Sequence, residues 1–151
     1  MNTDTFKLPV TFGETYLLRI VGAALNTELF FKIADHEFVV VAVDASYTKP
    51  YQTDVILLAP GQTTDILLTA NRDPGQYYMA ARAYSSSEIA AFDNTTTTAI
   101  LQYDSASTPA LQSDPLLPSL PAYNDTTAVT EFMTSLRSLA SSEHPIEVDL
   151  D

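Results

Sequence analysis

The chain has 151 residues, of which 46% are hydrophobic and 10% aromatic, a composition typical of one folded domain with room for a tail. Its 19 acidic and 7 basic residues give a net charge of −12 at pH 7, which argues against nucleic acid or an anionic membrane surface as the partner. The absence of cysteine excludes disulfides, thiol catalysis and thiolate metal sites. No apolar run is long enough to cross a bilayer, and the first residues lack the features of a signal peptide.

Short apolar runs separated by turn residues predict seven β-strands before residue 104. These strands are Glu14–Val21, Leu29–Ile33, Glu37–Asp44, Asp54–Leu58, Thr64–Leu68, Gln76–Arg82 and Thr97–Tyr103. Thr5–Leu8 fits a further edge strand, which Pro9 would end because proline cannot donate a backbone hydrogen bond. The even spacing of strands and turns is typical of an antiparallel all-β sandwich or barrel.

The character of the sequence changes after Asp104, where serine, alanine, threonine and several prolines predict an extended linker. Apolar residues then recur at helical spacing, which predicts one short α-helix between Ala128 and Ala140. A residue from Asp125 to Thr127 can cap its first turn. We therefore divide the chain into a β domain at residues 1–104 and, at residues 105–151, a Pro-rich linker with a short helix and an acidic tail.

Several segments, taken together, resemble the middle cupredoxin domain of plant laccases, which are three-domain multicopper oxidases. They are Thr15–Ile20 (TYLLRI), Glu28–Ile33 (ELFFKI), Leu58–Thr64 (LAPGQTT) and Phe92–Tyr103 (FDNTTTTAILQY). Two further segments, Leu120–Asp125 and Ser135–Ala140, resemble the linker that leads to the third domain. The resemblance implies an all-β, cupredoxin-like Greek-key β-sandwich with a C-terminal Pro-rich linker and one short α-helix.

Copper ligands are scarce in this chain. A blue-copper centre needs two histidines and a cysteine thiolate, and the resemblance implies that the trinuclear cluster takes its histidines from the first and third domains. The chain has only His36 and His144, on a predicted hairpin turn and in the tail, and we expect both to be exposed. We therefore predict that this chain binds no metal and no cofactor, and that copper belongs to the complete enzyme.

Asp54 is the sharpest candidate for a pocket residue. The resemblance implies that an acid at the start of this strand borders the phenol pocket, where its carboxylate can accept the proton that phenol oxidation releases. The alternative is that Asp54 only satisfies backbone donors at the strand start. Gln52 and Tyr51 are expected to share the rim.

Phe92, in the loop from Ser85 to Asn94, is a second candidate, since an aromatic ring can form a wall against a phenol. The alternative is an ordinary core or interface aromatic. Asn94 and Asn124 begin glycosylation sequons, which matter only in a secreted protein. By resemblance, the complete protein is extracellular, in the apoplast.

Two functions follow from these features. The first is the structural and substrate-pocket domain of a plant-type laccase, an oxidase of phenols and lignin precursors that reduces dioxygen to water. Its partners would be the flanking cupredoxin domains and a phenolic small molecule at their seam. The second is a stand-alone, non-catalytic cupredoxin-like binding module from a truncated gene. In either case we predict that the isolated chain has no oxidase activity.

Overall fold

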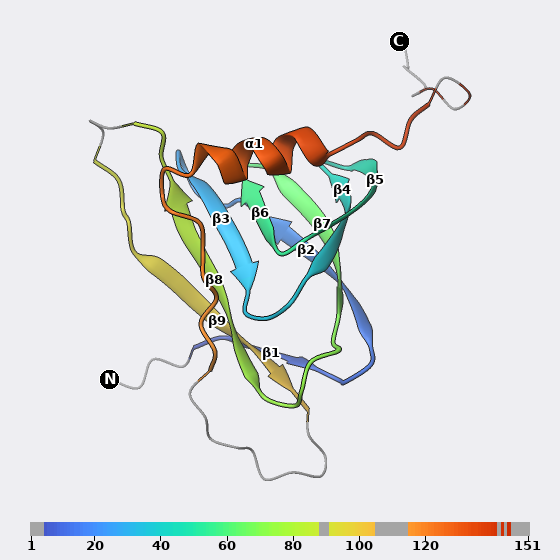
Figure 1. Ribbon diagram of the computed structural model, residues 1–151, viewed down its shortest axis with the longest axis vertical. Coiled ribbons are helices and arrows are strands. Elements are labelled where there is room, and N and C mark those ends of the chain that lie inside the picture. Colours follow the sequence, from blue (N-terminus) through green and yellow to red (C-terminus); the bar gives the residue numbers. More distant parts are fainter. Residues whose placement is uncertain (1–4, 88–90, 105–114, 142, 144, 146–151) are drawn as a thin grey trace.

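The computed structural model describes residues 5–87, 91–104, 115–141, 143 and 145. These residues form two β-sheets that face each other and one short helix (Figure 1). The elements are β1 (Lys7–Val10), β2 (Thr15–Val21), β3 (Glu28–Ile33), β4 (Phe38–Val43), β5 (Ser46–Thr53), β6 (Val55–Leu58), β7 (Thr63–Thr69), β8 (Gln76–Tyr84), β9 (Thr96–Tyr103) and α1 (Thr126–Ser135). The predicted sandwich architecture is confirmed.

The chain passes repeatedly between the two sheets. One sheet has the strand order β1-β9-β8-β3-β6, and the other has the order β2-β7-β4-β5. Strands β5, β6, β7 and β8 alternate between the sheets, as in Greek-key sandwiches. Neighbouring strands are antiparallel except β1 and β9, which pair in parallel.

The core lies between the sheets because alternate residues of each strand point inward. In β4, Phe38 and Val40 are buried in the core, and after a bulge between Val40 and Ala42 it is Val43 that packs against the core. In β2 the inward residues are half-buried and the outward residues exposed. The largest fully buried apolar side chains are Phe30, Phe38, Ile33, Ile56, Ile66 and Leu68 of both sheets, together with Leu101 of β9.

Both edge strands that contain proline differ from the prediction. Pro9 lies inside β1 instead of ending a strand, and β5, which contains Pro50, was not predicted at all. Each of these strands lies at the edge of its sheet, where the missing N–H of proline can face away from the ladder. The β4–β5 turn was not predicted either. Its residues Asp44 and Ala45 have the positive φ values that a two-residue hairpin turn requires. The sequence lacks the Asn-Gly pair that usually indicates such a turn.

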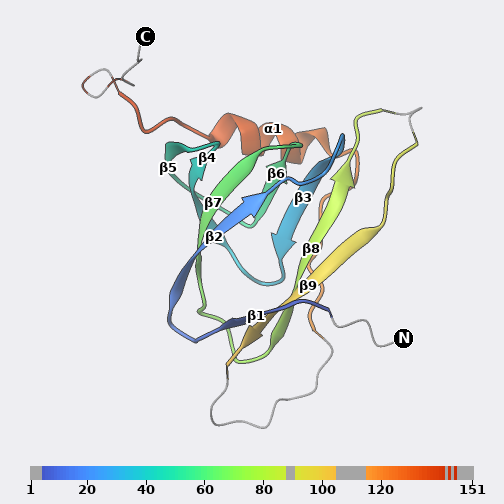
Figure 2. The same ribbon diagram turned by 180° about the vertical axis from the view of Figure 1, so that it is seen from behind.

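The C-terminal segment lies along the five-stranded sheet. Residues 115–125 run along β8, where the N–H of Tyr78 donates to Leu116 O at 2.9 Å and the N–H of Ser85 donates to Tyr123 O at 2.7 Å. Helix α1 then lies across one end of the sandwich and buries Phe132 (Figures 1 and 2). No helix of the described residues is long and apolar enough to span a membrane. The predicted linker residues 105–114 and tail residues 146–151 lie outside the described part of the chain.

Helix α1 begins earlier and ends earlier than predicted. Asp125 is its N-cap and accepts a hydrogen bond from the N–H of Ala128 at 3.0 Å, as expected. The helix ends at Ser135 because Leu136 has an extended backbone, and the chain then pairs with β5 through the N–H of Leu139 and Tyr47 O at 3.1 Å. Leu139 is exposed, so the apolar stripe of the sequence overstates the helix length.

Candidate functional site

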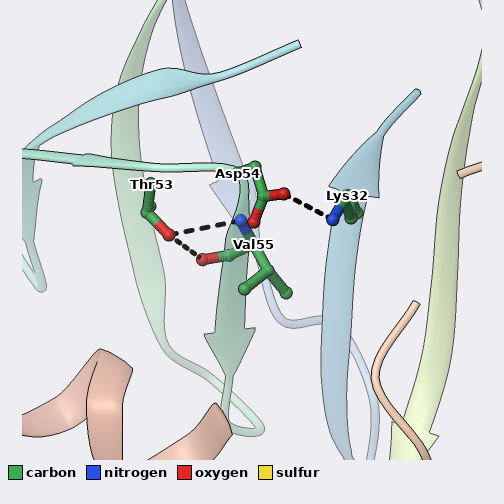
Figure 3. Close-up of polar contacts among 4 residues, drawn as sticks. All are labelled: Lys32, Thr53, Asp54 and Val55. Carbon is green, nitrogen blue, oxygen red and sulfur yellow. Dashed lines mark hydrogen bonds and ion pairs between the residues drawn. The ribbon is translucent and has the colours of Figure 1, made fainter. Parts of the chain in front are cut away.

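Asp54 occupies the single position between β5 and β6, where the chain crosses from one sheet to the other. The backbone at this crossing is held by Thr53 (Figure 3). Thr53 Oγ1 donates to Val55 O at 2.9 Å and accepts from the N–H of Val55 at 3.3 Å. Asp54 therefore does not satisfy the first backbone donor of β6, which was the alternative role considered for it.

The carboxylate of Asp54 is paired with Lys32 of β3 (Figure 3). The distance from Lys32 Nζ to Asp54 Oδ2 is 2.5 Å, and the side chains of Lys32 and Asp54 are 18% and 47% exposed. Among the described residues, Oδ1 of Asp54 has no hydrogen-bond partner. One carboxylate oxygen is thus held by the protein, and no hydrogen bond within the described residues occupies the other.

Lys32 was not predicted from the sequence as a site residue. It faces Asp54 because β3 and β6 pair antiparallel, with Lys32 opposite Val55. The signal in the sequence is a lysine within the otherwise apolar run from Leu29 to Ile33. That run does not reveal the partner, because the register between β3 and β6 is set by tertiary packing.

Tyr51 and Gln52 are close to Asp54 in sequence but have other partners. The ring of Tyr51 is half-buried, with its centroid 6.2 Å from that of Phe132 in α1. Gln52 is exposed and donates from Nε2 to Glu37 Oε2 at 2.7 Å. Neither side chain has a hydrogen bond or ring contact to Asp54 in the part of the chain that is described.

Phe92 and Asp54 contact different parts of the five-stranded sheet. Asp54 pairs with Lys32, which lies opposite Ala80 in β8, whereas Phe92 packs on Tyr123, whose carbonyl accepts from the N–H of Ser85 just beyond the end of β8. The Phe92 ring is half-buried, and its centroid is 5.3 Å from that of Tyr123. The two pocket candidates therefore belong to different regions of the domain and do not form one pocket.

The two sequon asparagines lie beside this aromatic pair. Asn94 follows Phe92 by two positions, Asn124 follows Tyr123 directly, and both asparagines are exposed. The Phe92–Tyr123 contact therefore brings two sites that are separate in the sequence to one corner of the domain. This convergence could not be read from the sequence.

His36 is buried, so the prediction that it is exposed was wrong. It is only 2% exposed, and its ring packs edge-on against Tyr77 with centroids 4.8 Å apart. Nδ1 lies 2.6 Å from Ala34 O, and Nε2 lies 2.7 Å from the hydroxyl of Tyr103. A carbonyl can only accept, so Nδ1 carries the proton and Nε2 accepts from Tyr103.

The surroundings of His36 also shift its titration. Burial lowers the pKa of His36 because the charged imidazolium loses hydration, and the hydrogen bond to Ala34 only partly opposes this. Burial likewise raises the pKa of Tyr103. The Tyr103 hydroxyl also accepts from the N–H of Arg72 at 3.1 Å, so this cluster joins the β3–β4 turn, the β7–β8 loop and the end of β9.

The described residues offer few side chains that could bind a metal ion. No group of three or more His, Cys, Asp or Glu side chains that could hold a metal ion occurs among the described residues. Both ring nitrogens of His36 are engaged within the protein, and His144 lies outside the described residues. With no cysteine in the chain, these donors do not fit a blue-copper centre.

A shallow hollow of about 380 Å³ lies elsewhere, on the outer face of the four-stranded sheet. Its lining includes Val21, Tyr47 and an ion pair between Arg19 Nε and Asp65 Oδ2 at 3.6 Å. None of the predicted pocket residues lines it. The hollow is open and weakly formed, so we regard it as part of an exposed sheet face and not as the site.

The family model described as multicopper oxidase matches residues 1–106 of this chain. The chain belongs to the multicopper oxidase family. This multicopper oxidase segment is 59% identical over 146 residues to Putative laccase-17 of Oryza sativa subsp. japonica, covering 97% of this chain and 26% of that protein. It is 52% identical over 156 residues to Laccase-5 of Arabidopsis thaliana, covering 97% of this chain and 27% of that protein. It thus spans about a quarter of the length of the curated relatives it matches.

Solved structures confirm the cupredoxin-like fold of this multicopper oxidase segment. The laccase from Botrytis aclada matches with a TM-score of 0.60 and 29% identity, covering 76% of this chain and 21% of that structure. Fet3p, a multicopper oxidase that functions in iron import, matches with a TM-score of 0.62 and 26% identity, covering 78% and 22% of the two chains. The resemblance to laccases expected from the sequence is therefore confirmed.

Proposed function

We propose that this chain is the middle cupredoxin domain of a plant-type laccase, with a structural and substrate-pocket role. The complete enzyme would oxidise phenols and lignin precursors and reduce dioxygen. The observation that carries this proposal is the match to plant laccases along 97% of this chain but only about a quarter of their length. One cupredoxin-like sandwich in a longer polypeptide accounts for both numbers.

In the pocket, Asp54 would handle the proton. Oxidation of a phenol to a phenoxyl radical removes one electron and one proton. The free Oδ1 of Asp54 is placed to accept a hydrogen bond from the phenol hydroxyl and then its proton. Copper in the complete enzyme would supply the electron acceptor.

We further propose that this chain carries no copper centre itself. The chain has no cysteine and only two histidines, and the buried one uses both ring nitrogens within the protein. The flanking cupredoxin domains would then bring the copper sites, and the phenol would bind at a seam between domains. Exposed apolar side chains on the four-stranded sheet, Leu17, Val21 and Tyr47, are consistent with such neighbours.

The same proposal covers the location of the protein. A plant-type laccase acts outside the cell, in the apoplast, where Asn94 and Asn124 would be accessible for glycosylation. Both side chains are exposed, as an acceptor asparagine must be. Mass analysis of the protein from its native tissue, before and after enzymatic removal of N-glycans, tests this part.

The test of the pocket role uses a full-length laccase that contains this segment. Asp54→Asn should lower kcat/KM for a phenol at mildly acidic pH by roughly a hundredfold, the lower end of the usual range for a general base. A non-phenolic one-electron donor should change little because no proton has to leave. Asp65→Asn is the matched control, since it removes a carboxylate that is paired with Arg19 on another face. Equal losses on both donors would overturn the pocket role.

A further inference from the structure

We propose that Lys32 adapts this pocket to phenols that carry a carboxylate, by holding Asp54 through one oxygen and offsetting its charge. The inference rests on the proposed pocket role of Asp54 and adds a substrate class to it. Lys32 is a positioning residue here, since the acceptor of the phenol hydroxyl remains Asp54.

Lys32 lies in an inner strand of the sheet, so its ion pair with Asp54 is held by the fold. Strand β3 lies between β6 and β8, and Lys32 pairs with Val55 on one side and Ala80 on the other. Its side chain is only 18% exposed, and Asp54 is its one polar side-chain partner among the described residues. An ammonium group so far removed from water depends on its carboxylate more than a surface lysine does.

Asp54 is fixed at two levels. Its backbone is set by the hydrogen-bonded link between Thr53 and Val55, and its carboxylate is set by Lys32 at Oδ2 (Figure 3). The side chain is nonetheless 47% exposed. In this proposal a phenol approaches Oδ1 from the exposed side of the carboxylate while Oδ2 stays on the lysine.

The charge of the pair decides which phenols can approach. An unpaired carboxylate beside the phenol hydroxyl would repel a second carboxylate on the same substrate, in a chain that already carries a net charge of −12. The ammonium at 2.5 Å turns Asp54 into one end of a neutral pair. For charges several ångströms apart near a protein surface, removing this compensation corresponds to about a threefold to tenfold loss in binding.

The test compares a phenol that bears a carboxylate with the methyl ester of the same phenol, in the full-length laccase. Lys32→Met should lower kcat/KM for the acid about threefold to tenfold more than for the ester, mainly through KM. Added salt should narrow this difference. Lys32→Arg keeps the charge and should restore the acid-to-ester ratio. Lys49→Met is the matched control, because Lys49 is an exposed lysine of β5 with no contact to Asp54 among the described residues.

Asp54→Asn should change the acid-to-ester ratio of kcat/KM in the opposite direction, and it replaces Lys32→Met as the test if that variant fails to fold. It leaves the ammonium unpaired, so the acid should gain on the ester although both are oxidised more slowly. An acid-to-ester ratio that is unchanged in Lys32→Met, or in Asp54→Asn if that variant alone folds, overturns this inference. The pocket role itself fails only if Asp54→Asn has no selective effect on phenols compared with the non-phenolic donor.

Discussion

The hydroxyl of Tyr103 should contribute measurably to stability through His36. Tyr103→Phe keeps the ring but removes the donor to Nε2 of His36 and the acceptor for the N–H of Arg72. His36 is 2% exposed, so its Nε2 stays unsatisfied, and the N–H of Arg72 loses its acceptor as well. An unsatisfied buried acceptor costs about 1–3 kcal/mol, so we expect a loss of about 2 kcal/mol in the free energy of unfolding.

Urea unfolding followed by circular dichroism measures this loss, with an unchanged slope showing that the denatured state is unaffected. In thermal unfolding, the same loss corresponds to about 4–8 °C for a domain of this size. Tyr77→Phe is the matched control, because its hydroxyl donates to Asp73 O at 2.8 Å in an exposed turn. It should cost less than about 1 kcal/mol. Equal losses in the two variants would refute the role of the buried hydrogen bond.

Three further predictions concern pH, the helix and copper. The pKa of His36 in the folded chain lies below its value of 6.5 in the unfolded chain, so the unfolded chain binds the proton first as the pH falls. The free energy of unfolding should therefore decrease below about pH 6.5. Urea titrations at about pH 7.5 and 5.5 measure this decrease, and His36→Gln should remove it. Phe132→Ala should lower the free energy of unfolding by about 3 kcal/mol, and Met133→Ala, 62% exposed on the same helix, by less than about 0.5 kcal/mol. After dialysis against copper, the isolated chain should retain no stoichiometric copper by metal analysis and oxidise no phenol beyond free copper, and one tightly held ion would contradict the donor count.

The strands that could be predicted are those that bury a face. The run Phe38–Val43 alternates buried and half-buried residues, and this period of two is a local property of the sequence. Strand β5 has no such pattern, because an edge strand gains its pairing from backbone hydrogen bonds. Its side chains are mostly polar and exposed, so the sequence carries no apolar signal there.

In the candidate site, Asp54 could be predicted from the sequence and its partner Lys32 could not, for a related reason. Asp54 stands out by its place before an apolar run, but Lys32 meets it only through the register between β3 and β6. His36 shows the same limit. It lies in a turn, which favours exposure, yet Tyr77 and Tyr103 from two distant strands enclose it. Contacts set by tertiary packing leave no mark on a local stretch of sequence.

The strand order has a mechanical consequence for a longer polypeptide. Strand β1 borders one side of the sandwich, whereas the chain after α1 runs beside β5 on the opposite side. The described chain therefore enters β1 on one flank and leaves α1 on the other, with the width of the sheets between them. Asp54 stands on the flank of β5 and β6. The residues that follow α1 thus lie on the same flank as the pocket proposed around Asp54, and those that precede β1 lie on the other flank.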